Sequence, residues 1–279
     1  MRSGQEGDPL KHQGQDRKIV GKLIRFLDDQ GVSKEFSDRL VLEIGKFFLG
    51  THYGVGTLET KGAERLGINL REFDCVTFVE NVIALAWLVT SRKKSFEAFR
   101  KMLQKIRYRQ GRLQGYTSRL HYFSDWIYDN QKKGIVRDVT EEIGGRPLRG
   151  AVTFMTAHAD LYPPLKDAVT FQRLKSIERT VSRRSLFFIP KKALMRLESR
   201  IQEGDLLAIT TKTEGLDVCH AGFAARVKNR VHLLHASSSE GRVVLSPKTL
   251  YRYLMESQAR SGIMVARLEG RGWDAEGKI

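Results

Sequence analysis

Hydrophobic residues recur at helical spacing through the first half of the chain. This pattern predicts amphipathic helices within residues 17–50, a long buried helix that begins near residue 75, and another amphipathic helix over 95–109. A segment dense in aromatic and polar residues follows over 111–134, and its terminal glycine is typical of a helix end. Residues 1–16 are polar and lack this periodicity, so we expect a disordered tail there.

The second half of the chain changes to the alternating pattern of β-strands. From Gly204 onward the strand-like stretches are 204–211, 216–227, 230–238, 241–246 and 262–268. Helices followed by an antiparallel meander predict the α+β class. The chain shows no internal repeat and no linker of distinct composition, so we expect one domain over residues 17–270. Extra N-terminal helices and an insertion of helices and loops at about residues 100–200 would decorate it.

The net charge limits the possible partners. The 279-residue chain has a formal net charge of +16, which favours a polyanion. Nucleic acid, an anionic cell-wall polymer and a carboxylate-rich peptide all fit this charge. The basic residues are spread along the sequence, and no glycine-rich phosphate loop or nucleic-acid motif organises them. Charge alone therefore does not choose the partner, and a solvated basic surface is the default interpretation.

Cysteine content and apolar runs exclude several classes of protein. Two cysteines form no disulfide framework, and no CxxC pair indicates structural zinc. Glu80 and Asn81 interrupt the longest apolar run, so no membrane span is expected. The first residues also lack the apolar segment of a signal peptide. The sequence therefore predicts either a cytoplasmic protein or one whose leader precedes residue 1.

One cysteine, Cys75, occupies a position with chemical consequences. Asp74 is a good helix N-cap, and Phe73 and Phe78 fit the two ends of a hydrophobic staple. Cys75 is then the first helical residue, where free backbone amides and the helix dipole stabilise an anion. In this setting we expect a lowered thiol pKa and a nucleophilic thiolate. The alternative is that Cys75 is a small buried hydrophobe, as most free cysteines are.

A thiolate nucleophile requires a base, and the chain has seven histidines. His220 and His235 lie on consecutive expected strands, either of which can turn its histidine toward the cysteine helix. Strand alternation places His220 on one face with Val218, and it places Cys219 on the other face, where we expect core packing. The same alternation directs His232 away from His235. These positions are compatible with a base on one strand and a polar orienting residue on the next.

Two other interpretations of the strand histidines stay open from the residues alone. The histidines can be ordinary residues hydrogen-bonded at the sheet surface. They can also form a zinc site with Cys75, although no ligand pair here has metal spacing. We therefore expect no metal and no cofactor.

Several motifs, taken in order, resemble a known family. They are "GTLE", "FDCVTFVEN", "YRQGRLQGYTSRLHYFSDW", "GDLLAITTKTEGLDVCHAGFA" and "LLHASS". From about Tyr53 to Leu254 the chain resembles the N-acetylmuramoyl-L-alanine amidase-like family, within the NlpC-type cysteine peptidases of bacterial cell walls. The resemblance implies a catalytic domain with a papain-like α+β fold, in which the cysteine helix packs on a small antiparallel sheet.

The resemblance also implies a role for each candidate. Cys75 would be the nucleophile, His220 the base and His235 the orienting third residue, while Asp74 and Tyr53 would lie near the oxyanion site. The thiolate would attack an amide carbonyl, and the Cys75 backbone amide would help to hold the oxyanion. His220 would protonate the leaving amine and then activate water. The bond implied joins the lactyl group of N-acetylmuramic acid to L-alanine of the stem peptide, in peptidoglycan or in muropeptide fragments.

The insertion offers candidates for substrate binding. Arginines can clamp stem-peptide carboxylates, and aromatic side chains can stack on sugar faces. The candidates are Arg109, Tyr116, Ser118, Arg119, His121, Tyr122 and Trp126. For Trp126 and Phe123, packing of an aromatic helix on the core is the alternative.

Two competing functions complete the set of hypotheses. An endopeptidase of the same superfamily, which cuts the stem peptide after D-glutamate, would use the same three residues, so only the insertion separates the two. A basic nucleic-acid-binding protein with an inactive papain-like fold is the alternative of another class, and the intact Cys/His/His set argues against it. We therefore expect a peptidoglycan or muropeptide substrate and no nucleic acid. The family is usually exported, which suggests the periplasm or cell envelope and conflicts with the missing signal segment.

Overall fold

The structure is a computed structural model that describes residues 9–59, 62–92 and 94–270. Its longer helices are α1 (Pro9–Asp29), α2 (Asp38–Phe47), α3 (Cys75–Thr90), α4 (Phe96–Arg107), α5 (Phe123–Lys132) and α8 (Ala168–Ser182). Its shorter helices are α6 (Thr140–Ile143), α7 (Phe154–Ala157), α9 (Leu194–Leu197) and α10 (Leu250–Met255).

Helix α1 corrects the expectation of a disordered tail over residues 1–16. The helix includes residues 9–16, and the Asp16 carboxylate is buried, where it accepts hydrogen bonds from the Leu70 amide (3.1 Å) and Arg71 Nε (3.4 Å). A polar sequence suggested disorder because this long-range contact is invisible in the local pattern. Residues 1–8 lie outside the described part of the chain.

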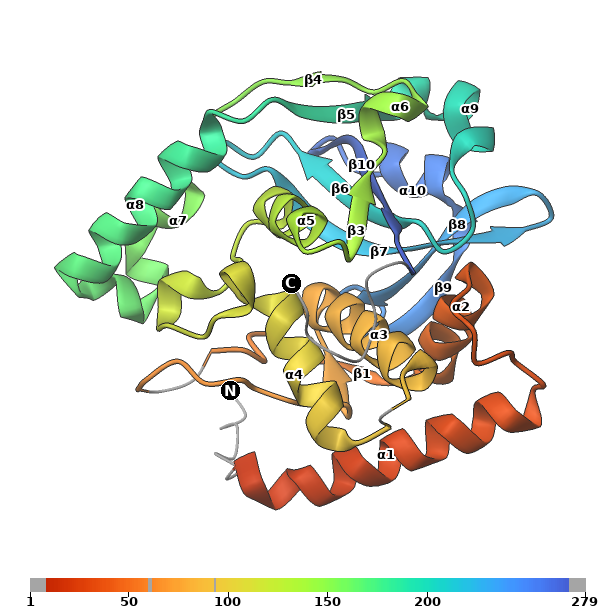
Figure 1. The fold of residues 1–279 in the computed structure, drawn as a ribbon. Helices are drawn as coiled ribbons and strands as arrows, with labels where there is room; N and C mark the ends of the chain where they lie inside the picture. The colour runs from red at the N-terminus through yellow and green to blue at the C-terminus, as the bar shows by residue number, and fades with distance from the viewer. Residues whose placement is uncertain (1–8, 60–61, 93, 271–279) are drawn as a thin grey trace.

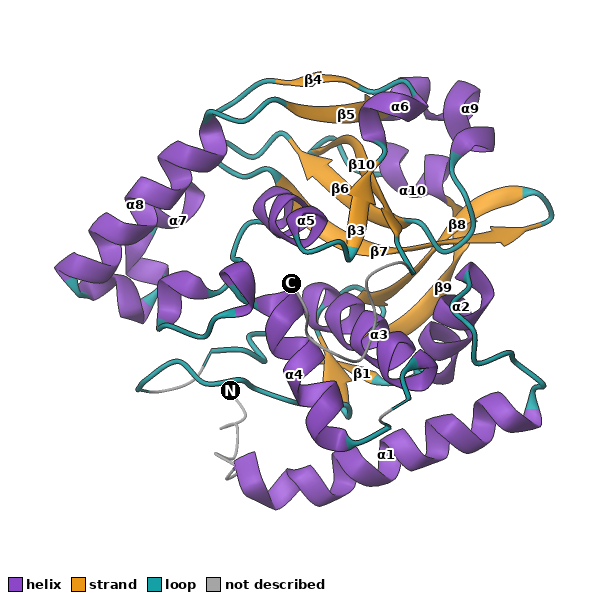
Figure 2. Cartoon of the chain, viewed as in Figure 1, coloured by secondary structure: helices purple, strands orange, loops and turns teal. Residues whose placement is uncertain are grey.

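The strands of the described chain form one curled sheet (Figures 1 and 2). They are β1 (His52–Tyr53), β2 (Glu72–Phe73), β3 (Val136–Asp138), β4 (Arg146–Leu148), β5 (Leu186–Pro190), β6 (Leu206–Thr211), β7 (Val218–Val227), β8 (Arg230–Ser237), β9 (Arg242–Thr249) and β10 (Arg260–Leu268). Their order is β2-β1-β9-β8-β7-β6-β10-β5-β4, and β3 pairs with β10. The strands from β9 to β5 pair antiparallel, as expected from the meander. The sheet is larger than the small sheet expected, because strands of the insertion extend it beyond β10.

Hydrophobic residues cover both faces of the sheet. One face packs against α3 and the helices around it, through residues such as Phe223 and Leu234. The other face packs against α6, α9 and α10, through residues such as Ala224 and Leu233. The successive residues of β7 and β8 therefore alternate between two separate cores, as the period of a strand requires.

Helix α3 is buried along nearly all of its length and lies against β7, β8, α2 and α4. Its apolar residues surround the helix instead of forming one stripe, which is typical of a helix enclosed on all sides. This packing holds its first residue, Cys75, beside the sheet.

A β-bulge near the start of β7 corrects the expected alternation. Ile209 of β6 pairs with His220, whereas Thr210 pairs with Val218, so Cys219 is the extra residue. Val218 consequently packs in the core on the α3 side, and it does not share the face of His220. Cys219 is exposed, so the expectation that it packs in the core is wrong.

The part of the insertion around α7 and α8 has a small hydrophobic core of its own. It consists of Tyr122, Val152, Met155, Leu165, Leu174 and Val181. Tyr122 joins this core to the rest of the molecule, because its hydroxyl donates to the buried Glu178 carboxylate on α8 (2.6 Å).

Candidate active site

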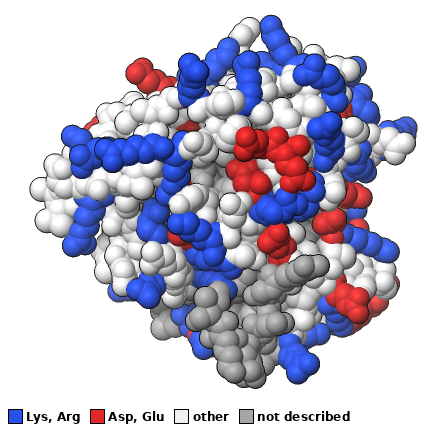
Figure 3. Space-filling model, turned by 45° about the horizontal axis from the view of Figure 1, so that its top comes forward, with Lys and Arg blue, Asp and Glu red and all other residues white. Residues whose placement is uncertain are grey.

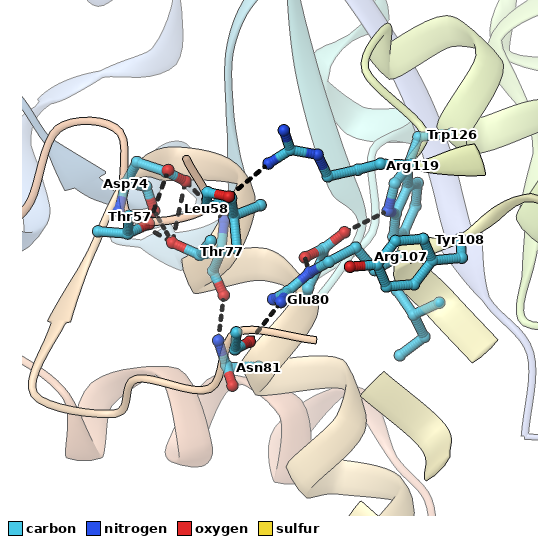
Figure 4. Close-up of polar contacts among 12 residues, drawn as sticks. Thr57, Leu58, Asp74, Thr77, Glu80, Asn81, Arg107, Tyr108, Arg119 and Trp126 are labelled. Carbon is cyan, nitrogen blue, oxygen red and sulfur yellow. Dashed lines mark hydrogen bonds and ion pairs between the residues drawn. The ribbon is translucent and has the colours of Figure 1, made fainter. Parts of the chain in front are cut away.

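The N-terminus of α3 has a reciprocal cap. The Asp74 carboxylate accepts a hydrogen bond from the Thr77 amide (2.7 Å), and the Thr77 hydroxyl accepts one from the Asp74 amide (2.9 Å). The Thr57 hydroxyl donates to the second Asp74 oxygen (3.1 Å), as Figure 4 shows. These bonds fix the helix start, and therefore the backbone position of Cys75.

Cys75 is half-buried, and removal of its thiol from water changes its acidity. Burial, with a smaller contribution from the Asp74 carboxylate, raises the pKa of Cys75 to about 12. The amides of Ala221 and of Cys75 itself donate toward the sulfur and lower the pKa, but by less than burial raises it. The expected drop in pKa at the helix start is therefore wrong for the free protein. A charge at a helix terminus gains less than a buried charge loses by leaving water.

His220 and His235 form one pair on the sheet. Nε2 of His220 lies 2.6 Å from Nδ1 of His235, and the two rings are nearly perpendicular at 87°. One of the two nitrogens carries the shared proton, because a hydrogen bond between imidazoles needs one donor and one acceptor. Gly222 lets β8 come close, since a Cβ there would meet the Leu234 carbonyl oxygen at 2.7 Å and the His235 Cβ at 2.8 Å.

Both histidines are neutral at ordinary pH. Burial, the neighbouring His235 and Arg260 lower the pKa of His220 to about 3. Burial and Arg260 lower the pKa of His235 to about 4. The Arg260 guanidinium itself stacks on the Tyr253 ring at 3.8 Å.

Two tyrosines border the thiol and the histidine pair. The ring of Tyr253 lies 5.4 Å from that of His235 and 6.3 Å from that of His220. Burial raises the pKa of Tyr253, and the nearby thiols of Cys219 and Cys75 raise it further. Burial, Cys75 and Asp74 raise the pKa of Tyr53 to about 12. Both phenols are therefore neutral donors close to Cys75.

Cys75 is linked to the strand that carries His220 by a backbone hydrogen bond. The amide that donates toward its sulfur belongs to Ala221, the residue directly after His220. Within the described chain no direct hydrogen bond joins the sulfur to the His220 ring. The structure thus brings the three candidates to one end of β7, with Nδ1 of His220 left free by the bond to His235.

His232 faces the other way, as expected from alternation. Its Nδ1 lies 2.9 Å from the Ser246 carbonyl oxygen, and the side chain is buried. This bond ties β8 to β9 and leaves no role for His232 in the pair.

Arg109 and Ser118 line a cavity of about 640 Å³ between residues 109–118 and helix α8. Arg109 begins a 3-10 turn, η1 (Arg109–Gly111), and forms a bidentate ion pair with the buried Asp125 (2.5 and 3.2 Å). Arg184 contacts the same carboxylate at 2.7 Å. One carboxylate therefore serves two guanidinium groups, and this corner keeps a positive charge.

Arg119 is buried and already paired, unlike the free carboxylate clamp expected. It donates to the Leu58 carbonyl oxygen (3.0 Å) and to the Glu59 carboxylate (2.7 Å). Its guanidinium also lies 5.1 Å from the Tyr116 ring centroid. Since Leu58 follows Thr57, which holds Asp74, these bonds connect the insertion to the cap of α3 (Figure 4).

The remaining aromatic candidates are structural in this conformation. Trp126 is fully buried and donates to Glu80 (3.1 Å), and Tyr122 is 2% exposed. The Nε2 of His121 lies 2.8 Å from the Tyr116 carbonyl oxygen, and burial and Arg119 lower the pKa of His121 to about 3. The expected stacking of Trp126 and Tyr122 on sugars is therefore wrong here, and core packing is what the structure shows. Phe123 likewise stacks on Trp126 at 5.1 Å.

Sequence reasoning missed an ion pair beneath the candidate site. Arg107 Nε contacts Glu80 at 2.6 Å, and both side chains are 1% exposed. Arg107 also donates to the Gly67 carbonyl oxygen. The only sequence signal was a charge inside the apolar run of α3, because a buried ion needs a partner. Tyr253 and Arg260 carried no such signal.

The described residues contain no group of three or more His, Cys, Asp or Glu side chains arranged to hold a metal ion. No described helix is both long enough and apolar enough to cross a membrane.

Comparison with known proteins identifies the family. The model of the N-acetylmuramoyl-L-alanine amidase-like family matches residues 43–263, which is most of the chain. The chain belongs to this amidase-like family. Residues 43–263 include both cysteines and the histidine pair, so the candidate site lies inside the matched region.

Solved structures resemble this member of the amidase-like family over most of its length. An N-acetylmuramoyl-L-alanine amidase from Bacteroides uniformis ATCC 8492 is 38% identical, with a TM-score of 0.79, over 83% of this chain and 98% of that chain. A putative xylanase from Bacteroides fragilis is also 38% identical, with a TM-score of 0.76, over 81% and 100%. A Legionella pneumophila protein is 24% identical, with a TM-score of 0.70, over 94% and 97%, and it shares the fold. No curated protein matches the chain.

Proposed function

We propose that the protein is a cysteine hydrolase that cleaves the amide between N-acetylmuramic acid and L-alanine, in peptidoglycan or in muropeptide fragments. The observation that carries the proposal is the bonded pair of His220 and His235, together with the donation of the Ala221 amide, directly after His220, toward the sulfur at the capped start of α3. Membership of the amidase-like family and a neighbour named as an N-acetylmuramoyl-L-alanine amidase support the choice of bond.

The geometry assigns a distinct task to each residue of the proposed triad. His235 occupies Nε2 of His220, which leaves Nδ1 of His220 to take the thiol proton. The Cys75 sulfur then adds to the amide carbonyl, and the Cys75 amide at the helix start, which donates toward the sulfur in the free protein, becomes a donor for the resulting oxyanion. His220 gives its proton to the leaving amine as the carbon–nitrogen bond breaks. It then takes a proton from water, whose oxygen attacks the thioester carbonyl; the carbon–sulfur bond breaks, the acid is released, and the proton returns from His220 to the Cys75 sulfur.

The protonation states favour one version of this mechanism. Burial keeps the Cys75 thiol and both imidazoles neutral before substrate binds. The proton therefore moves to His220 as the carbon–sulfur bond forms, and no thiolate–imidazolium pair needs to exist in the free protein. His235 stabilises the imidazolium that appears during the reaction.

A papain-like fold of the NlpC type is part of the proposal. The nucleophile helix α3 lies against the antiparallel strands β7 and β8, which carry the base and its orienting residue. The other strands and the small core of the insertion would be additions to that framework.

Substrate recognition is proposed for the cavity beside η1. Arg109, Arg184 and Arg173 line it together with Ser118, and the single carboxylate of Asp125 does not neutralise three guanidinium groups. A carboxylate of the stem peptide is a suitable second counter-charge for these three guanidinium groups.

Product analysis on one defined disaccharide–peptide tests the proposal. We expect release of the intact stem peptide, and no product with Cys75→Ala. A product in which L-Ala-D-Glu stays on the disaccharide and the rest of the peptide is released would instead assign a stem-peptide endopeptidase. A protein that cuts neither bond and binds duplex DNA in a strongly salt-dependent way would be the nucleic-acid-binding alternative.

A further inference from the structure

A groove lined by basic side chains runs along one end of the molecule. Two pockets of about 710 and 750 Å³ share Lys212 and Ser261, so they form one continuous depression, which we call the basic groove. Its basic lining residues are Arg146, Arg149, Arg184, Lys191, Lys192, Arg196 and Lys212. Figure 3 shows Lys and Arg side chains crowding the upper part of that view, over the end of the molecule that carries β4, β5 and α9.

Most basic residues of this groove have no carboxylate partner among the described residues, although Lys191 Nζ donates to the Ser257 carbonyl oxygen (2.8 Å). Apart from Arg184, which pairs with Asp125, none of these residues forms an ion pair with another described residue, and five of the six unpaired ones are exposed. Arg109, Arg119 and Arg184 differ, since each is tied to a carboxylate. Like charges gathered without counter-charges repel one another, and this repulsion is relieved when an anion binds.

The acidic residues of the lining do not compensate these charges. They are Glu214 and Asp217. Asp217 is buried, and its two oxygens accept hydrogen bonds from the amides of Ser124 (2.8 Å) and Val218 (2.8 Å). Only Glu214 faces the groove as a free carboxylate.

The inner end of the basic groove adjoins the candidate active site. The Lys212 amide donates to the Ala259 carbonyl oxygen (2.8 Å), and Ser261 Oγ lies 2.7 Å from Thr210 Oγ1. Between Ala259 and Ser261 stands Arg260, which stacks on Tyr253 next to the histidine pair. The inner end of the groove is thus one residue away from Arg260, which contacts Tyr253 beside the histidine pair.

We propose that the basic groove holds carboxylate-bearing stem peptides of polymeric murein that neighbour the peptide being cut. This inference rests on the function proposed above. The basic lining and its position beside the Arg260 segment favour an anionic part of the substrate over an unrelated polyanion. Phe188, the aromatic ring in the described lining, is covered by the Arg146 guanidinium at 5.3 Å, so it offers no free face for stacking nucleic-acid bases.

A binding assay that needs no catalysis tests the groove. In a Cys75→Ala background, Lys192→Glu/Lys212→Glu reverses two exposed charges of the groove. Lys18→Glu/Lys101→Glu, on α1 and α4, makes the same change in net charge elsewhere on the surface. We expect the groove variant to bind insoluble murein sacculi about tenfold more weakly at low salt, with the difference vanishing at high salt. The control variant should bind like the parent protein.

Activity on a small substrate separates the two proposals. With Cys75 intact, the groove variant should cut a soluble disaccharide–peptide at the parental rate, which also shows that it folds. Lys192→Gln/Lys212→Gln should give a smaller loss of sacculus binding in the same direction. Equal sacculus binding by groove and control variants overturns the inference, as does a groove variant that loses binding to duplex DNA alone. Failure of the parent protein to cut the soluble substrate would overturn the proposed function and leave the binding result standing.

Discussion

Nε2 of His220 lies 2.6 Å from Nδ1 of His235, and this contact gives the two rings different roles: His235 orients His220, and His220 is the candidate base. A ring held at Nε2 has one free nitrogen, Nδ1, so His220 is oriented before any substrate arrives. His235 touches the candidate base, and it acts on the thiol only through that base.

The histidines should therefore contribute unequally to turnover. His220→Ala should lower turnover about 10³-fold or more, the scale of losing a catalytic base. His235→Asn should retain measurable activity, because an amide can still hold Nε2, and His235→Ala should lose more. The measurement is the rate of stem-peptide release from a defined muropeptide.

His232 provides the internal control for this ordering. His232→Gln should change the rate little, since glutamine can replace the bond to the Ser246 carbonyl oxygen. A dead His232→Gln together with an active His235→Ala would require the triad to be redrawn around His232.

The two cysteines should differ in both accessibility and importance. Cys219 is exposed at the bulge, whereas Cys75 is only half-exposed and has a pKa raised to about 12, so iodoacetamide at neutral pH should label Cys219 first in the free protein. Cys219→Ser should keep activity, whereas Cys75→Ala should lose about 10³-fold or more. Mass analysis of the labelled peptides and turnover of both variants check this. Loss of activity in Cys219→Ser with an active Cys75→Ala would exchange their roles.

The buried histidines should make the protein sensitive to acid. The folded pKa values of His220 and His235, about 3 and about 4, lie below the ordinary histidine value, so below pH 6.5 the unfolded chain binds protons that the folded chain excludes. Their contribution to stability is complete above pH 6.5 and is lost as pH falls toward pH 4 and then 3. His235→Asn should make this fall shallower by about 1.4 kcal/mol per pH unit between about pH 6 and 4.5. Urea unfolding across that range gives the slope, and parallel slopes in both proteins would contradict the assignment.

The ion pair of Glu80 and Arg107 should be costly to break. Glu80→Gln leaves a guanidinium buried without its counter-charge, which should lower the free energy of unfolding by about 3–5 kcal/mol. Glu97→Gln, which breaks the exposed pair with Arg100, should cost less than about 1 kcal/mol. Urea denaturation of both variants tests the contrast, and equal small losses would show that Arg107 finds another partner.

The sequence predicts those features of the site that depend on neighbouring residues better than those that depend on long-range contacts. The Asp74 cap depends on residues within one turn, so its pattern is readable, and the alternation that separates His232 from His235 is equally local. The bulge at Cys219 depends on pairing with β6, which no single strand reveals. The acidity of Cys75 was misjudged because burial comes from the whole fold.

The residues of the insertion also show that long-range contacts are not predictable from residue type. Trp126 and Arg119 have the chemistry of surface recognition, yet each is buried against a partner far along the chain, Glu80 and Leu58 respectively. Residue type alone does not distinguish a side chain that contacts a ligand from one that supports the helix beneath the site. The contact partner of the side chain distinguishes the two roles, and that partner is set by the tertiary structure.

The position of β10 has a consequence for how the protein becomes active during its synthesis. This strand is the last of the described chain, yet it lies in the interior of the sheet, between β6 and β5. Its first residue, Arg260, stacks on Tyr253 beside the histidines. A nascent chain that ends before residue 260 therefore has an open edge on β6 and lacks this support of the histidine pair. The proposed hydrolysis should consequently begin only after β10 has left the ribosome, and truncations before residue 260 should abolish it even though they spare Cys75, His220 and His235.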